Sequence, residues 1–158
     1  MIDLGQGMRV EGASSGALRK ALLAEHDQLR GFLNETVDDA SARAVGGGEL
    51  GLLRAQVRHL YVTIEEHLAF EKVALPQALR DVIGWGAVLQ EQIEERHAEE
   101  RAALAEALKA LEPETISPVE VARELRALAM RVLSDIESED AALLNADLDA
   151  IATDSSGG

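Results

Sequence analysis

The stretch that decides the fold is Glu49–Leu75, which reads ELGLLRAQVRHLYVTIEEHLAFEKVAL. At spacings of three and four, one side of it forms an apolar stripe that becomes ionisable near its end: Leu53, Val57, Leu60, Ile64, His67, Glu71, Ala74. Such a stripe is typical of a helix that packs one face against a core. The stretch therefore predicts an amphipathic helix with two ionisable side chains facing inward.

Three further segments show the same pattern, each with an apolar stripe interrupted near its middle. Their stripes are Leu18, Leu22, His26, Leu29 and Leu33; Leu89, Ile93, His97, Glu100, Leu104 and Leu108; and Val121, Leu125, Leu128, Val132, Asp135, Glu139 and Ala142. The predicted helices are Ser15–Thr36, Glu49–Leu75, Ala87–Leu111 and Pro118–Leu148. Glycine- and proline-containing connections separate them, and short connections favour antiparallel neighbours. The chain is therefore expected to be all-α, an antiparallel up-and-down four-helix bundle.

The fourth helix has the clearest start signal. Ser117 can cap the helix, Pro118 suits its first position, and Glu120 stands three residues after the serine, where it completes a capping box. The start of this helix is therefore predicted at Pro118.

Composition limits the remaining choices. The chain has 158 residues, one Trp, one Tyr and two Phe, which suits one helical domain better than a β-sheet. It contains no cysteine, so histidines and carboxylates are the only strong metal ligands available. Its net charge of −14 should repel nucleic acid and anionic membranes. With no membrane span or targeting segment expected, the predicted location is cytoplasmic.

The domain is expected to occupy residues 15–150. Residues 1–14 are aperiodic and are expected to form a flexible N-terminal arm, and residues 151–158 end in Ser-Ser-Gly-Gly and are expected to form a disordered tail. Within the domain, His67-Leu-Ala-Phe-Glu71 is echoed by Asp135-Ile-Glu-Ser-Glu139, which suggests two related helical hairpins.

The interrupted stripes predict a metal site. An isolated buried ion costs several kcal/mol, so ionisable side chains on four facing helices need mutual pairing or a shared cation. Residues four apart lie on one helical face, so a pair such as His67 and Glu71 can aim at one buried point. Six residues are therefore predicted as ligands of a buried bimetal site: His26, His67, Glu71, His97, Asp135 and Glu139. Carboxylates with imidazoles suit iron first, with manganese or zinc as alternatives.

These residues resemble the hemerythrin-like, or HHE cation-binding, family over roughly residues 15–148. The resemblance rests on Glu25-His26-Asp-Gln-Leu, on His67-Leu-Ala-Phe-Glu71-Lys-Val-Ala-Leu-Pro76, on Arg96-His97-Ala-Glu-Glu and on Asp135-Ile-Glu-Ser-Glu139. It implies a di-iron centre in which Glu71 and Glu139 bridge the metals and the three histidines are terminal ligands. Such a centre would bind a small diatomic molecule or a peroxide.

Two departures from the family bear on function. The family usually has histidine where this chain has Asp135, and its oxygen carriers have a second histidine on the third helix, where Ile93 or Arg101 stands here. An added carboxylate lowers the net charge of the site by one and should favour the ferric state. The chain is therefore expected to react with oxygen irreversibly rather than to carry it.

Several residue roles stay open at this point. Asp135 could be a hydrogen-bond acceptor that orients His26 or His97 instead of a ligand, and Asp140 could take the role of Glu139. Glu100, one turn beyond His97, could be a seventh ligand or an ion-pair partner of a nearby arginine.

Three functions fit the pattern. The first is a hemerythrin-like di-iron protein that binds, senses or reduces small oxidants such as oxygen, nitric oxide or peroxide. The second is a di-iron oxidase or oxygenase with an organic substrate, which would need a cavity beside the metals. Its expected lining is Leu29, Ile64, Phe70, Ile93 and Val132. The third is a metal-free helical interaction module.

Overall fold

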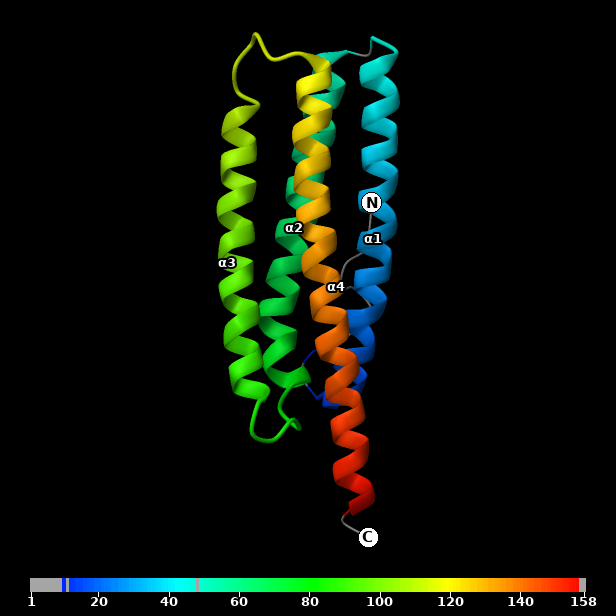
Figure 1. Cartoon of the computed structure of the whole chain (residues 1–158), viewed down its shortest axis with the longest axis vertical. Helices are drawn as coiled ribbons and strands as arrows, with labels where there is room; N and C mark the ends of the chain where they lie inside the picture. The colour runs from blue at the N-terminus through cyan, green and yellow to red at the C-terminus, as the bar shows by residue number, and fades with distance from the viewer. Residues whose placement is uncertain (1–9, 11, 48, 157–158) are drawn as a thin grey trace.

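The computed structural model describes residues 10, 12–47 and 49–156, with side chains described as far as residue 150. It contains four long helices: α1 (Ser15–Val45), α2 (Leu50–Ala78), α3 (Gly86–Ala110) and α4 (Pro118–Ser156). Successive helices run in opposite directions, as the colour gradient shows by running upward in α1 and α3 and downward in α2 and α4 (Figure 1). The predicted all-α four-helix bundle is confirmed.

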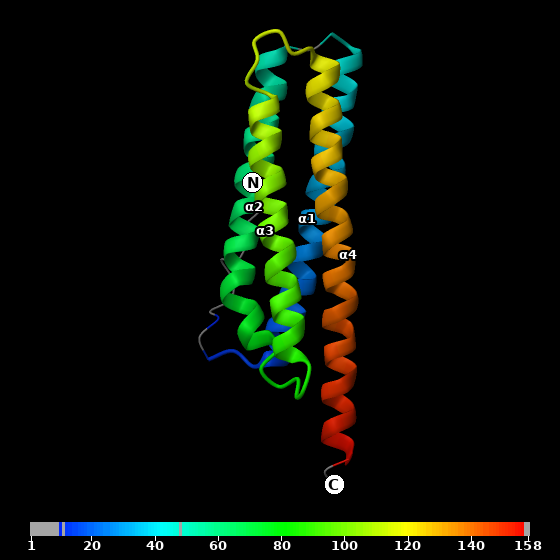
Figure 2. The same ribbon diagram turned by 60° about the vertical axis from the view of Figure 1, so that its left-hand side comes forward.

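The helices pack around a square with one short diagonal. α1 lies against α2 and α4, and α3 lies against the same two helices. α2 and α4 also approach each other across the diagonal, whereas α1 and α3 make no close approach within the described residues. Figure 2 shows the turned bundle, with α4 projecting past the end of the other three helices.

The helix boundaries differ from the expected ones at three C-terminal ends. α1 continues past Thr36 to Val45, because no glycine or proline interrupts the sequence before Gly46. α2 continues past Leu75 to Ala78 and so includes Pro76, whose missing N–H removes one intrahelical hydrogen bond just before the helix ends. α4 continues past Leu148 to Ser156, so residues 151–156 of the expected disordered tail are helical, while residues 157–158 lie outside the described residues.

The N-terminal ends of α1 and α4 are capped by serine side chains. Ser14, within the expected N-terminal arm, accepts a hydrogen bond from the Ala17 amide on its Oγ at 3.1 Å and caps α1. At α4, Glu120 N donates to Ser117 Oγ at 3.2 Å and Ser117 N donates to Glu120 Oε2 at 2.9 Å, which confirms the predicted capping box. Most of the expected arm, residues 1–9 and 11, lies outside the described residues.

The connection between α2 and α3 turns tightly against the end of α2. Gly84 has a φ of +93°, which is open to glycine without strain. A Cβ added to Gly86 would lie 2.9 Å from the carbonyl oxygen of Leu79, so only glycine permits this approach. The two glycines around Trp85 therefore close this end of the bundle.

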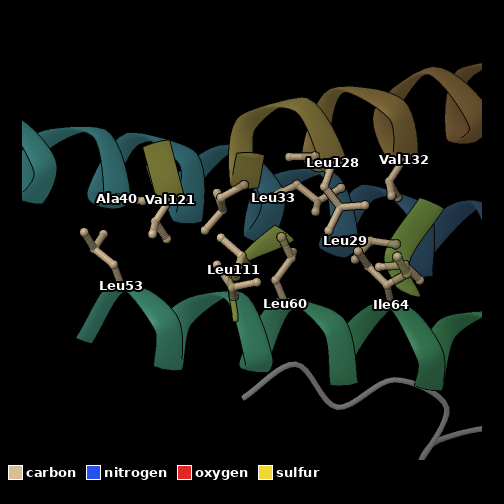
Figure 3. Packing of buried hydrophobic residues seen from close by; sticks show 14 of the residues in the cluster. Leu29, Leu33, Ala40, Leu53, Leu60, Ile64, Leu111, Val121, Leu128 and Val132 are labelled. Atoms are coloured by element: carbon tan, nitrogen blue, oxygen red, sulfur yellow. The ribbon is translucent and has the colours of Figure 1, made fainter. Parts of the chain in front are cut away.

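The apolar core falls into two clusters along the bundle axis. The larger cluster fills the half nearer the α1–α2 and α3–α4 connections, and Figure 3 shows side chains from three helices meeting there, among them Leu29, Leu60 and Val132. The smaller cluster fills the half nearer the α2–α3 connection and includes Leu22, Ile93 and Leu143. The boundary between these two clusters is where the ionisable residues of the stripes lie.

Arg19 crosses the end of the bundle below the smaller cluster. It is only 2% exposed. Its guanidinium donates to Asp147 of α4 at 2.7 Å, to Asp81 of the α2–α3 connection at 2.5 Å, and to the carbonyl of Ala78 at 2.8 Å. A buried arginine needs such partners, and this one joins three segments of the chain.

No helix in the described part of the chain is long and apolar enough to cross a membrane.

Candidate metal centre

A layer of buried polar side chains separates the two apolar clusters. Each of the four helices contributes to it, and its members are at most 6% exposed: Glu25, His26, His67, Glu71, His97, Glu100 and Glu139. Polar groups at this depth need hydrogen-bond or ionic partners, so their contacts reveal what the layer can bind.

Glu71 is fully buried at the centre of the layer and contacts histidines from three helices. Its Oε1 lies 2.6 Å from Nε2 of His26 and also contacts Nε2 of His67, one helical turn away. Its Oε2 lies 2.7 Å from Nε2 of His97. The three histidines therefore point the same ring nitrogen at one carboxylate.

Glu139 spans the layer in a similar way from α4. Its Oε1 accepts a hydrogen bond from Nε2 of His97 at 2.6 Å, and its Oε2 lies 3.4 Å from Nε2 of His26. Each of the two carboxylates thus has one oxygen on the His26 side of the layer and one on the His97 side.

The second ring nitrogen of two histidines is held by an outer carboxylate. His26 Nδ1 donates to Asp140 Oδ1 at 2.6 Å, and His67 Nδ1 donates to Glu25 Oε1 at 2.7 Å. Arg30 in turn donates to Oδ2 of Asp140 at 2.6 Å. Histidines that bind metals commonly make this kind of outer hydrogen bond, which fixes the ring and leaves Nε2 as the ligand atom.

The histidines are held as cations by these carboxylates. Burial lowers the pKa of His26, but the hydrogen bonds to Asp140 and Glu71 outweigh it and raise the pKa to about 9. In the same way, burial opposes but Glu71 and Glu25 raise the pKa of His67 to about 10. Burial also opposes the shift of His97, whose pKa Glu139 and Glu71 raise to about 10. Protons therefore occupy ligand positions that a metal ion would take.

The two central carboxylates differ in charge state. Burial works against the ionisation of Glu71, but the three adjacent histidines outweigh it and hold its pKa well below the usual range. Burial, helped by the charge of Glu71, raises the pKa of Glu139 to about 7. One of these two carboxylates is therefore a firm anion and the other lies near the point of half-protonation at neutral pH.

One atom of the layer lacks a well-aligned partner. The Nε2 hydrogen of His97 points to Glu139, so Oε2 of Glu71 accepts no hydrogen bond even though the nitrogen is 2.7 Å away. Its remaining partner is the charge of protonated His97, and a metal ion that took the place of that proton would give this buried oxygen a direct ligand bond. Imidazole nitrogens and carboxylate oxygens without sulfur are also a suitable donor set for iron, manganese or zinc.

Four of the predicted ligands form one compact group. His26, His67, Glu71 and Glu139 each offer one ligand atom, and these atoms lie within 4.8 Å of one another. This buried group could hold a metal ion. His97, the fifth predicted ligand, contacts both Glu71 and Glu139 from α3.

Asp135, the sixth, lies beside the layer. It is half-buried and makes no short contact with the three histidines or with Glu71 and Glu139, so its role as a ligand stays a prediction. The adjacent Ile136 is 1% exposed and takes the inward place on α4. Burial raises the pKa of the Asp135 carboxyl.

The open choice between Glu139 and Asp140 has a structural answer. Glu139 lies inside the layer, whereas Asp140 is partly exposed and contacts His26 from outside. Asp140 therefore has the orienting role that was one alternative for Asp135. Two hydrogen bonds, from His26 and Arg30, outweigh burial and hold the pKa of Asp140 below its usual range.

Glu25 is the residue of the layer that sequence reasoning did not assign, whereas the stripe of the third helix already placed Glu100 inward. Glu25 fits the α1 stripe as well as His26 does, three residues after Leu22, so a signal for it was present. Glu100 is 2% exposed and forms no ion pair with an arginine among the described residues. Burial, together with the charge of Asp135, raises its pKa to about 8.

A cavity of about 250 Å³ lies between α2 and α3 and extends inward as far as the polar layer. Its lining residues are Glu71, Lys72, Leu75, Pro76, Glu94, His97 and Arg101. The residues expected to line a substrate cavity do not line this one: Leu29, Ile64, Ile93 and Val132 are packed in the two apolar clusters, and Phe70 packs against the smaller one. This cavity lies at the interface of two helices instead.

Comparisons with protein-family models, with curated proteins and with solved structures found no match to this chain.

Proposed function

We propose that this chain is a non-haem iron protein that holds two iron ions in the buried layer and binds, senses or reduces small oxidants such as oxygen, nitric oxide or peroxide. The observation that carries the proposal is the convergence of three Nε2 atoms, one from each of three helices, on the carboxylates of Glu71 and Glu139. The outer hydrogen bonds from His26 and His67 orient two of these atoms.

Two ions fit the distribution of ligand atoms better than one. His26 and His67 lie at Oε1 of Glu71, and His97 lies at Oε2. Glu139 has Oε1 beside His97 and Oε2 beside His26. Each carboxylate can therefore serve two positions, one with two histidines and one with a single histidine. The resemblance to hemerythrin-like proteins suggests the same bridging roles.

The position beside His97 has fewer protein ligands and faces the cavity, because His97 and Glu71 both line it. When bound there, iron would supply the capacity to exchange electrons with a small oxidant. The two apolar clusters exclude bulk water from the layer on either side. Asp140 and Glu25 keep the imidazoles of His26 and His67 oriented. The cavity therefore gives an external ligand a route that ends beside His97.

Metal analysis tests the proposal. The protein is isolated from iron-replete cells, its metal content is measured, and its absorption spectrum is recorded before and after peroxide. We expect two irons per chain and a spectral change with peroxide. Protein without bound metal, whose melting temperature does not rise when Fe(II) is added without oxygen, would overturn the proposal and support a metal-free interaction module instead.

An oxidase or oxygenase that acts on an organic substrate is the second candidate function. The observation that favours it is the cavity, whose volume of about 250 Å³ is several times that of a diatomic molecule. Single-turnover exposure of the Fe(II) protein to oxygen, with and without organic substrates, separates the two functions. Faster iron oxidation in the presence of one such compound, with that compound consumed, would favour the second.

A further inference from the structure

The cavity between α2 and α3 has a charged rim as well as a polar floor. Lys72 of α2 and Arg101 of α3 both line it and are both exposed. Neither forms an ion pair within the part of the chain that the structure describes. In a chain of net charge −14, two cations without carboxylate partners at one opening mark it as a place for an anion.

The two cations are next to residues of the metal layer. Arg101 stands four residues after His97, so it lies one turn further along the same face of α3. Lys72 follows Glu71 directly on α2. The cations therefore flank the opening while His97 and Glu71 lie deeper, and an anion held at the rim would keep the rest of its molecule near the layer.

One acidic side chain also lines the cavity. Glu94 is exposed, and its Oε1 accepts a hydrogen bond from Gln90 on the same helix at 3.1 Å. The rim thus has two positive charges against one negative charge. It favours a single anionic group rather than a polyanion.

The rest of the lining is apolar. Leu75 and Pro76 form the α2 wall of the cavity beside Lys72. A volume of about 250 Å³ equals the share of about eight water molecules in the liquid, which is more than a three-atom inorganic anion fills. An organic group of several carbon atoms would cover this wall and displace the water from it.

We propose that this cavity binds a small organic carboxylate. Its carboxylate pairs with the guanidinium fork of Arg101 and with Lys72, its organic part lies over Leu75 and Pro76, and its far end is directed towards His97 and Glu71. Arginine suits this role because its planar fork matches the two oxygens of a carboxylate. Binding of the carboxylate does not require the proposed iron site. Only its role as the organic substrate rests on that proposed function.

Binding measurements with simple probes test the proposal. Calorimetric titration of the protein, after its metal content has been measured, compares four probes: benzoate, benzamide, acetate and nitrite. We expect benzoate to bind more tightly than each of the others, because only benzoate combines the anion with a large apolar group. In Arg101→Gln the affinity for benzoate should fall at least tenfold, while in Arg101→Lys it should fall less.

Arg126→Gln is the matched control. Arg126 is exposed on α4 and does not line the cavity, so this variant changes the net charge equally and should bind benzoate as the unaltered protein does. Equal binding of benzoate and benzamide, equal binding of nitrite and benzoate, or an unchanged affinity in Arg101→Gln would each overturn the proposal.

The outcomes separate this proposal from the iron site. Two irons per chain without preferential binding of benzoate would sink the carboxylate site and leave the iron site standing. Benzoate binding that depends on Arg101 in a protein without iron would do the reverse. Metal content is measured in every variant, so that a lower affinity in Arg101→Gln is ascribed to the anion site only where the metal content is unchanged.

Discussion

Nδ1 of His67 on α2 donates a hydrogen bond to Oε1 of Glu25 on α1 across 2.7 Å, at the edge of the polar layer. The opposite ring nitrogen of His67 contacts Glu71, so the ring is held on both sides by carboxylates from different helices. Asp140 holds His26 in the same way from α4. These two pairs hold the histidines of α1 and α2 in a fixed orientation before any metal arrives.

Replacement of Glu25 tests this orientation. We expect Glu25→Ala to weaken metal binding by about 10- to 100-fold, because the outer partner of a ligating histidine fixes its tautomer and its ring. Glu25→Gln keeps an acceptor oxygen and should recover part of the loss. Affinity is measured by competition with a chelator of known strength. Glu66→Gln, an exposed change next to His67, is the control, and equal affinities in all four proteins would contradict the orienting role.

Metal binding should release protons. At pH 7 all three histidines of the layer are cationic, since their pKa values lie at about 9 to 10, and each must lose one proton to present Nε2 to a metal. We expect about three protons from the histidines and about half a proton from Glu139, whose pKa is about 7, to be released per chain on loading at pH 7. Affinity should rise with pH until it levels off above pH 10. Calorimetry in buffers of different ionisation enthalpy counts the protons. His59→Gln, an exposed histidine outside the layer, should release as many.

The same shifts set the alkaline stability of the metal-free protein. A histidine whose pKa in the folded protein lies above its ordinary value of 6.5 adds stability that is complete below pH 6.5 and is lost as pH rises through the folded pKa. We therefore expect the metal-free protein to lose stability between about pH 7 and 10, and the metal-loaded protein to lose less. Urea unfolding at several pH values, with and without a chelator, measures both curves. Parallel curves would contradict the proposed exchange of protons for metal.

Removal of the central carboxylate should destabilise the metal-free protein strongly. In Glu71→Gln the three histidines lose their shared anion, and loss of one partner in a buried ionic cluster costs about 3–5 kcal/mol. The histidine pKa values should fall at the same time, which nuclear magnetic resonance can follow ring by ring. Glu137→Gln makes the same chemical change on the exposed face of α4 and should leave stability within about 0.5 kcal/mol of the original.

Periodicity was sufficient to predict the bundle because every stripe had leucine, isoleucine or valine before its interruption and an apolar residue after it. Periodicity was also sufficient to predict that His67 and Glu71 face inward together, because they are four residues apart on one helix. It was not sufficient at Asp135, because after Val132 a helix of 3.6 residues per turn brings either the third or the fourth residue inward. The apolar Ile136 takes the buried place and leaves the charge at the edge.

Contacts between helices were beyond the reach of the pattern. That Glu25 meets His67, and that Asp140 rather than Asp135 meets His26, depends on how each helix is rotated about its own axis. The cavity depends in addition on the spacing of α2 and α3, which no stripe encodes. For this reason the pattern did not predict this cavity or the two cations at its rim.

The raised pKa of Glu100 leads to a second effect of pH on stability, in the interval from about pH 4.5 to about pH 8. Its pKa is raised from 4.5 to about 8, so the folded state binds a proton that the unfolded state releases, and stability falls as pH rises through this interval. Glu100→Gln removes the titrating group and should raise the stability of the metal-free protein at pH 8 more than at pH 5. Urea unfolding at the two values measures the difference. A stabilisation equal at both would show that Glu100 does not titrate here.

Asp135→His distinguishes a ligand from a neighbour of the layer. As a ligand, Asp135 adds one negative charge to the iron site and favours the ferric state, so its replacement by neutral histidine should slow oxidation of the Fe(II) protein by oxygen. Asp135 also raises the pKa of Glu100, and Asp135→Asn should lower that pKa whether or not Asp135 binds metal. Stopped-flow absorption measures the first effect and the pH dependence of unfolding measures the second. An unchanged oxidation rate in Asp135→His, together with a lowered Glu100 pKa in Asp135→Asn, would place Asp135 outside the ligand set and leave the reactivity of the site to His26, His67, Glu71, His97 and Glu139.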